Sequence, residues 1–169
     1  MRLTSPTPSH HDSARTGSGG AGVASVETLQ GLTLFAGLPA AELAQLASVL
    51  ELSSVRPGAI LETQDVPVRA WRMLVSGHAV VERDATPIGL LAAGDSWCEH
   101  SILNGMRSSI GVVALSPVTL LSANLPQFFA LPEDHPLLAG RLVARSATSA
   151  DRLALPVHNA LVHMTQRSA

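Results

Sequence analysis

The sequence has no lysine, no tyrosine and a single cysteine, and only 14% of its residues are charged, against the usual ~25%. All eleven basic residues are therefore arginines, and the formal net charge is −2. Such a chain lacks the clustered basic surface on which non-specific DNA binding depends. The lone Cys98 excludes an intrachain disulfide and a zinc site built from several cysteines. A local site for one phosphate stays open, and an arginine would have to hold it.

Long hydrophobic runs are also missing. No apolar run approaches the ~18–20 residues that a membrane-spanning helix needs, so no membrane span is expected. Residues 1–22 are rich in Ser, Gly, Pro and Thr and contain no hydrophobic segment of the secretory type. We therefore expect a cytoplasmic location by default. We also expect residues 1–25 to be a disordered tail, because they carry few bulky apolar groups.

The remaining length allows one domain, in which helical and strand patterns follow each other. Over 40–50 apolar residues recur at helical spacing. Over 52–121 about eight short apolar runs alternate with Gly and Pro turn signals, which is typical of an all-β barrel or sandwich. A short helix is predicted over 125–131, capped by Asn124 and ended by Pro132. A longer helix should run from about His135 or Pro136 to Ala154, with a break or kink at Pro156.

The segment from Gly94 to Ser109 contains the residue types that could bind a ligand. A strand ends there, a short turn or helix follows, and the chain enters a strand again, so the loop can present backbone N–H groups to an anion. Arg107 supplies a planar, permanently charged fork for phosphate oxygens. Glu99 supplies an acceptor for a sugar hydroxyl. One acid for a ribose and one arginine for a phosphate are the minimum needed to hold a nucleotide.

The same residues admit plainer interpretations. Arg107 and Glu99 could be a solvated surface pair, worth ~0–1 kcal/mol. Cys98 could be a nucleophile, or a metal ligand together with His100, but the sequence shows neither a positioned base nor further ligands. We therefore expect Cys98 to be a partly buried, inert thiol. We predict no metal site, no catalytic residue and no enzymatic activity.

At these residues the sequence resembles the cyclic-nucleotide-binding domain superfamily, which includes the catabolite activator proteins, the protein kinase A regulatory subunits and the cyclic-nucleotide-gated channels. The resemblance covers about Leu34 to Leu138. Its parts are the LFAGL, RPGAIL and LVSGHAVV segments at 34–38, 56–61 and 74–81, and Gly94-Asp95 followed by Glu99 and Arg107-Ser108. The last part looks like the superfamily's phosphate-binding cassette.

The resemblance implies a mainly β fold with flanking α-helices, a double-stranded β-helix or jelly-roll-like β-roll. The roll with its N-terminal helices would span 26–135, and a C-terminal helical segment would span 136–169. Glu99 would bind the ribose 2′-hydroxyl and Arg107 the cyclic phosphate, and Ser108 would contact phosphate or base. The rest of the ligand cradle would be Cys98, His100 and Ser109. The ligand would be cAMP or cGMP, and no further cofactor is required.

The sequence departs from the superfamily pattern at four places, one of which is His100-Ser101, where small or apolar residues are common. Cys98 stands where a glycine normally precedes the glutamate, and a Cβ there costs roughly 1 kcal/mol or more if the position needs a positive φ or a close backbone approach. The spacing from Glu99 to Arg107 is about one residue shorter than in many members, and Gln64 replaces a glycine before Asp65. An alternative function is therefore a fold that no longer binds nucleotide and serves as an interaction scaffold or subunit.

The region after the roll bears on the output of the module. About thirty residues follow its closing helix, too few for a helix-turn-helix domain, and they carry little basic charge. We therefore expect no direct DNA binding and an output through a protein partner. The Ala- and Leu-rich segment 137–155 could also form a homodimer through helix packing.

Overall fold

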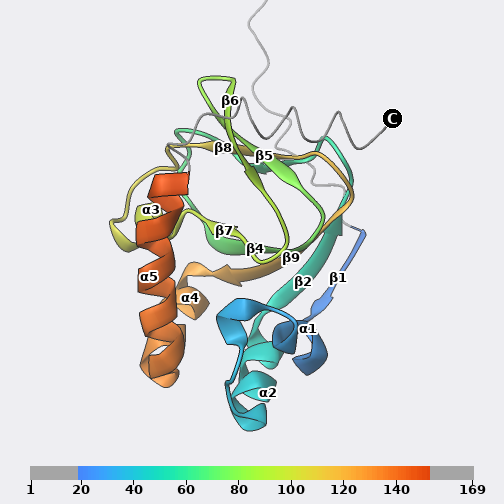
Figure 1. Ribbon diagram of the computed structural model, residues 1–169, viewed down its shortest axis with the longest axis vertical. Helices are drawn as coiled ribbons and strands as arrows, with labels where there is room; N and C mark the ends of the chain where they lie inside the picture. Colours follow the sequence, from blue (N-terminus) through green and yellow to red (C-terminus); the bar gives the residue numbers. More distant parts are fainter. Residues whose placement is uncertain (1–18, 153–169) are drawn as a thin grey trace, which may run out of the picture.

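The strands form two antiparallel sheets that face each other as a β-roll, with helices at one end and along one side (Figure 1). The computed structural model describes residues 19–152. Its elements, in chain order, are β1 Gly19–Val23, α1 Val26–Gln30, the 3-10 helix η1 Thr33–Phe35, α2 Ala40–Val49, β2 Glu51–Val55, β3 Ile60–Glu62, β4 Ala70–Ser76, β5 Ala79–Arg83, β6 Thr86–Leu91, β7 Ser96–Trp97, α3 Glu99–Leu103, β8 Gly111–Ala114, β9 Val118–Asn124, α4 Leu125–Asp134 and α5 Pro136–Arg152. The predicted fold class is confirmed.

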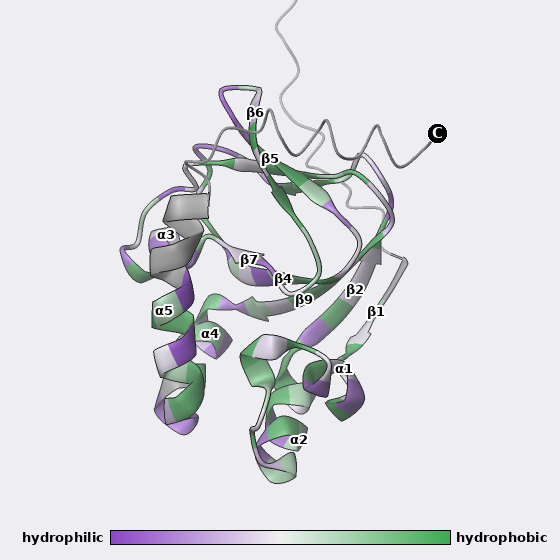
Figure 2. Ribbon diagram, in the orientation of Figure 1, coloured by the Kyte–Doolittle hydropathy of each residue, from purple (hydrophilic) through white to green (hydrophobic). Residues whose placement is uncertain are grey.

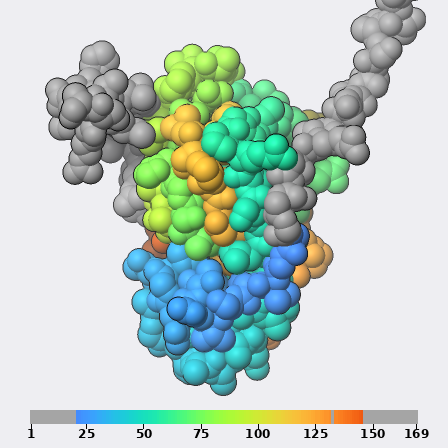
Figure 3. Space-filling model, turned by 90° about the vertical axis from the view of Figure 1, so that its right-hand side faces the viewer, coloured from blue at the N-terminus to red at the C-terminus, as the bar shows by residue number. Residues whose placement is uncertain are grey.

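The two sheets have five and four strands. The first has the order β1-β2-β9-β4-β7 and the second the order β3-β8-β5-β6. The eight strands from β2 to β9 occupy the region where about eight short runs were predicted. The N-terminal helices form one end of the molecule, beyond the strands (Figure 3).

Alternation along the strands produces two hydrophobic cores. Successive strand residues point to opposite faces of a sheet, so β4 places Trp71 and Met73 against the helices and Leu74 between the two sheets. On β9, Leu121 packs with the helices and Leu120 lies inside the roll. A polar strand residue whose side chain points into the roll therefore lies among apolar neighbours.

Strand β1 lies in the segment that was predicted to be disordered, so the structure differs from the expectation for residues 19–25. The strand pairs antiparallel with β2 through Gly22 and Val23, and the backbone N–H of Ala24 donates to Leu50 O at 3.0 Å. Strand pairing uses main-chain groups, so a segment poor in bulky side chains can still pair. Residues 1–18 lie outside the described part of the chain.

The helices after the roll begin as predicted but end differently. Asn124 caps α4 in a reciprocal capping box with Gln127. The helix does not end at Pro132 and runs on to Asp134. Pro136 sets its end, because the residue before a proline is disfavoured in the α conformation, and His135 has φ −134° and ψ 79°. The break predicted at Pro156 lies outside the described residues.

The turn between β4 and β5 requires its glycine. Gly77 has φ +87°, and a Cβ there would lie 2.4 Å from the carbonyl oxygen of Pro117. The next backbone N–H, that of His78, donates to Ser116 Oγ at 3.0 Å. The β4–β5 turn is therefore closely packed on the turn that precedes β9.

Candidate functional site

The cassette, which is the segment 98–109 between β7 and β8, begins with a strained residue. Cys98 has φ 70° and ψ 6°, a left-handed conformation, and it precedes the five-residue helix α3. A side chain with a Cβ is disfavoured in this conformation, which glycine adopts freely. The position that the resemblance marks as a glycine therefore has the backbone geometry of a glycine, although the chain has a cysteine there.

The thiol of Cys98 is partly buried and chemically unreactive. Its Sγ lies 3.4 Å from Ser108 Oγ, and burial, with smaller contributions from neighbouring charges, raises the pKa of Cys98 to about 12. A thiol with this pKa is almost entirely protonated near neutral pH, and the thiolate is the reactive form. The structure therefore supports the expectation of an inert thiol.

Glu99, the first residue of α3, is turned toward a strand of the roll. Its carboxylate Oε1 accepts a hydrogen bond of 3.0 Å from Trp71 Nε1 on β4. Only 1% of Glu99 is exposed. Trp71 is buried in the core, and it also donates the hydrogen bond that holds Glu99, the residue predicted to bind a ribose.

Arg107 is exposed at the far end of the cassette and is held by the β3–β4 loop. Its Nη1 donates to the backbone carbonyl of Asp65 at 2.6 Å. The backbone of Ser108 pairs with the same loop, donating to Val66 O at 2.9 Å and accepting from Asp65 N at 2.8 Å. Asp65 itself has φ 61°. The loop therefore fixes the main chain around Arg107 and one nitrogen of its guanidinium.

Gln64 fixes the same loop from the other side. Its side-chain amide donates to Asp84 Oδ1 at 2.9 Å and accepts from Asp84 N at 2.7 Å, across the tip of the β5–β6 hairpin. The residue that departs from the superfamily pattern thus has a structural role. It connects the loop that holds Arg107 to the hydrophilic tip of the hairpin (Figure 2).

The other predicted site residues differ in exposure. Ser108 is fully buried, and its Oγ donates to Ile110 O at 2.8 Å. Ser109 is exposed, and its carbonyl accepts from Arg83 Nε at 3.5 Å. His100 is exposed on α3, where its backbone carbonyl accepts from the Asn104 side chain at 2.8 Å.

The structure brings the predicted residues onto one cassette but gives its two charged members different partners. Glu99 is bonded to Trp71, and Arg107 is bonded to Asp65. Within residues 19–152 no hydrogen bond or ion pair joins Glu99 to Arg107. The Trp71 hydrogen bond occupies one oxygen, Oε1, of the Glu99 carboxylate.

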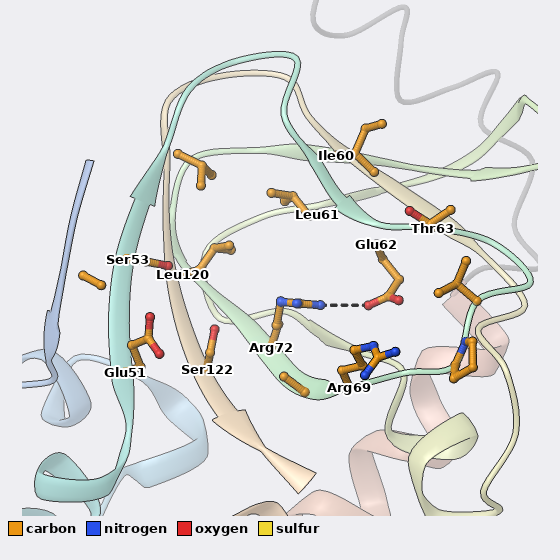
Figure 4. Close-up of a pocket in the computed structure, with 15 residues that line it drawn as sticks. Glu51, Ser53, Ile60, Leu61, Glu62, Thr63, Arg69, Arg72, Leu120 and Ser122 are labelled. Carbon is orange, nitrogen blue, oxygen red and sulfur yellow. Dashed lines mark hydrogen bonds and ion pairs between the residues drawn. The ribbon is translucent and has the colours of Figure 1, made fainter. Parts of the chain in front are cut away.

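A separate cavity opens between the two sheets, beside the cassette. It has a volume of about 700 Å³, and none of its lining residues belongs to the segment 98–109. On its inner wall Arg72 of β4 forms an ion pair of 3.0 Å with Glu62 of β3 (Figure 4). Polar side chains from β2 and β9, among them Ser53 and Ser122, line the same cavity.

The Glu62–Arg72 pair is largely desolvated on the glutamate side. The Glu62 side chain is 6% exposed and that of Arg72 is 27% exposed. Burial raises the pKa of Glu62 above its ordinary value, while the Arg72 charge and the approaching Trp97 indole act in the opposite direction. The Trp97 Nε1 is itself buried and has no acceptor of normal hydrogen-bond geometry in the described residues.

The sequence pattern does not predict this pair. One signal was available in the sequence. Glu62 and Arg72 are charged residues within short hydrophobic strands, β3 and β4. The alternation rule alone does not show that two strands from different sheets place these charges opposite each other.

The last helix connects the cassette side of the roll to its N-terminal helices. Arg141 of α5 donates through Nη1 to the carbonyls of Leu34 and Ala36, at 2.8 and 2.7 Å. Arg145, one turn further on, donates to Gly94 O in the turn that precedes β7. Helix α5 is thus attached both to η1 and to the chain entering the cassette.

Comparisons with known proteins bear on the fold. No protein-family model matches this chain, and no curated protein matches it significantly. Solved structures do match. The catabolite activator protein of Thermus thermophilus is 24% identical, with a TM-score of 0.62 over 80% of this chain and 62% of its own. A cyclic-nucleotide-binding domain from Methylobacillus flagellatus is 21% identical, with a TM-score of 0.60 over 73% and 72%.

A third match is the cAMP-bound chain named PfPKA-R, which is 17% identical with a TM-score of 0.65. The alignment covers 76% of this chain and 44% of that chain, so the chain spans less than half the length of this relative. The two facing sheets with their flanking helices are the fold of cyclic-nucleotide-binding domains. Among the described residues, no helix is long and apolar enough to cross a membrane.

Proposed function

We propose that the chain is a regulatory module that binds cAMP or cGMP at its cassette and acts through a protein partner. The observation that carries the proposal is the cassette itself. Glu99, Arg107 and Ser108 lie between β7 and β8 of a cyclic-nucleotide-binding fold, behind a left-handed residue at the position of the superfamily glycine. A buried carboxylate can accept from a ribose hydroxyl, and a guanidinium suits a cyclic phosphate.

Two changes would accompany binding. Glu99 would exchange the Trp71 indole for the ribose 2′-hydroxyl, which replaces one neutral donor by another at the same carboxylate. Arg107 would turn the guanidinium N–H groups that Asp65 does not use toward the phosphate. Because the β3–β4 loop already fixes the backbone at Arg107, little main-chain ordering would be needed, which lowers the entropic cost of binding.

Helix α5 is the element through which binding would reach a partner. Arg145 is bonded to the turn entering the cassette and Arg141 to η1. A shift of the cassette would therefore act on the same helix that contacts the N-terminal helices. Leu137 and Val143, both exposed on α5, offer apolar surface to a partner helix, which would be that of a protein partner or of a second copy of the chain.

Isothermal titration calorimetry with cAMP and with cGMP tests the proposal. We expect saturable binding of at least one nucleotide, and its loss in Arg107→Ala. Arg56→Ala is the matched control, because Arg56 is an exposed arginine on the β2–β3 turn and should leave binding unchanged. Absence of heat and of any thermal shift at millimolar nucleotide would reject the proposal.

A second function is favoured by the hydrogen bond between Trp71 and Glu99. Glu99, the residue predicted to bind the ribose, already accepts a hydrogen bond from Trp71 and is only 1% exposed. The fold could therefore serve as an interaction scaffold without nucleotide. A stoichiometric complex that forms equally well with the wild type and with Arg107→Ala, in the absence of nucleotide, would support the scaffold over the sensor.

A further inference from the structure

The cavity between the sheets has features of a ligand site that the cyclic-nucleotide proposal does not use. Its volume of about 700 Å³ falls in the range of pockets that hold small molecules. None of its lining residues belongs to the segment 98–109. A charged pair at its inner wall is unusual, because removing charged side chains from water costs free energy that only well-formed ion pairs and hydrogen bonds offset.

Arg72 has unused capacity to bind an anion. Its Nη1 donates to Glu62, and the described residues provide no acceptor for its Nε and Nη2. Arg69, which lines the same cavity near Arg72 (Figure 4), is exposed and makes no hydrogen bond or ion pair in residues 19–152. Glu62 shows that a carboxylate fits against Arg72 in this cavity.

The rest of the cavity is suited to an aliphatic group. Ile60 and Val66 line it and are 54% and 40% exposed, and they are among the few large hydrophobic residues exposed in the structure. Leu61 and Leu120 lie further inside, on β3 and β9. An acid group at the arginines and an apolar body along these residues would cover both kinds of surface.

We propose that this cavity binds a small aliphatic carboxylate, with Arg72 and Arg69 binding the acid group and Ile60, Leu61 and Val66 packing against the chain. The acid group takes the N–H groups of Arg72 that Glu62 leaves unused, or replaces Glu62 at Nη1. In both arrangements the Glu62 charge opposes binding. The buried Trp97 Nε1, which has no acceptor of normal geometry, is a further donor on the Glu62 side.

Calorimetric titration of the full chain with sodium octanoate, at constant ionic strength, tests the proposal. We expect saturable binding by the wild type. In Glu62→Gln binding should be about tenfold tighter, because the competing charge is removed while a hydrogen-bonding side chain remains. In the double variant Glu62→Gln/Arg72→Met binding should be lost. This double variant leaves no unpaired buried charge, so a native melting curve will show that it folds.

Neutral octanol and Arg107→Ala complete the test. Octanol should bind at least about tenfold more weakly than octanoate, and Arg107→Ala should bind octanoate like the wild type. No octanoate binding by the wild type, equal binding by a folded double variant, or equal binding of octanol would overturn the proposal. Cyclic-nucleotide binding depends on Arg107 and octanoate binding on Arg72, so the failure of either proposal is distinguishable from the failure of the other.

Discussion

The indole Nε1 of Trp71 donates a hydrogen bond of 3.0 Å to the carboxylate of Glu99, and both residues are buried. The bond joins the sheet to the cassette across 28 positions of sequence. It gives a hydrogen-bond donor to Oε1 of a buried carboxylate, on the residue that a ribose would contact. The stability of the cassette and its binding of a nucleotide therefore depend on the same side chain.

Loss of this hydrogen bond should destabilise the fold. Trp71→Phe leaves the Glu99 carboxylate without its indole donor, and we expect a loss of about 1–3 kcal/mol in the free energy of unfolding from this effect, measured by urea denaturation. The cavity left by the smaller ring adds a further loss. A double-mutant cycle with Glu99→Leu separates the two effects, and a coupling energy near zero would contradict the assigned hydrogen bond.

The left-handed backbone at Cys98 predicts that a glycine variant is more stable than an alanine variant, which is unusual. Cys98→Gly should be more stable than Cys98→Ala by about 1 kcal/mol, because alanine keeps the strain at φ 70° and glycine relieves it. Both variants lack the thiol, so their comparison isolates the backbone. At an ordinary helix position the order would be reversed. Equal stabilities, or a more stable alanine variant, would show that the residue is not left-handed in solution.

The buried thiol should resist alkylation. With the pKa of Cys98 raised from 9.0 to about 12, the thiolate fraction at pH 8 falls about a thousandfold relative to an unfolded chain, before access is considered. We expect iodoacetamide to modify the native protein at least that much more slowly than the urea-unfolded protein. Rapid modification of the native protein would contradict the raised pKa and the partial burial of Cys98.

The same pKa predicts the pH dependence of stability. Because folding raises the pKa of Cys98, the folded state favours the neutral thiol. The contribution is fully present below pH 9 and is lost as the pH rises toward about 12. The wild type should therefore lose stability above pH 9 relative to Cys98→Ala. Parallel stability curves for the two proteins over this range would contradict the shift.

Some features followed from the sequence and others did not. Glycine and proline turn signals located the strands from β2 to β9. The superfamily glycine at position 98 indicated either a positive φ or a close backbone approach, and Cys98 has a positive φ. Local patterns fix such features, because turn chemistry and alternation act over a few residues. They do not fix which strands face each other, so the pairs Trp71–Glu99 and Glu62–Arg72 appeared only in three dimensions.

Strand β1 and the end of α4 show the same limit. The glycine-rich segment 19–23 has few side chains to predict from, yet it pairs through its main chain with β2. Pro132 is a strong breaker signal, but the helix ends only before Pro136. Strand β1 depends on a partner strand that the local sequence does not contain, whereas α4 ends where the later proline, Pro136, disfavours the α conformation at His135.

The attachment of α5 can be weakened at one side chain. Arg141→Ala removes two hydrogen bonds to the carbonyls of Leu34 and Ala36. We expect a loss of about 1–2 kcal/mol in the free energy of unfolding. Amide hydrogen exchange in α5 should be faster than in the wild type, with a smaller change in the strands of the roll. Arg56→Ala is again the control. Unchanged exchange in α5 would show that Arg141 does not hold the helix in solution.

The central claim, that a cyclic nucleotide takes the Glu99 carboxylate from Trp71, can be tested by NMR. The chain has two tryptophans, so a nitrogen–proton correlation spectrum should contain two indole signals, and Trp71→Phe assigns them. On addition of cAMP or cGMP we predict that the Trp71 indole signal moves to a new position in the wild type and in Arg56→Ala, and stays in place in Arg107→Ala. A Trp71 signal that does not move at millimolar concentrations of either nucleotide would contradict the account.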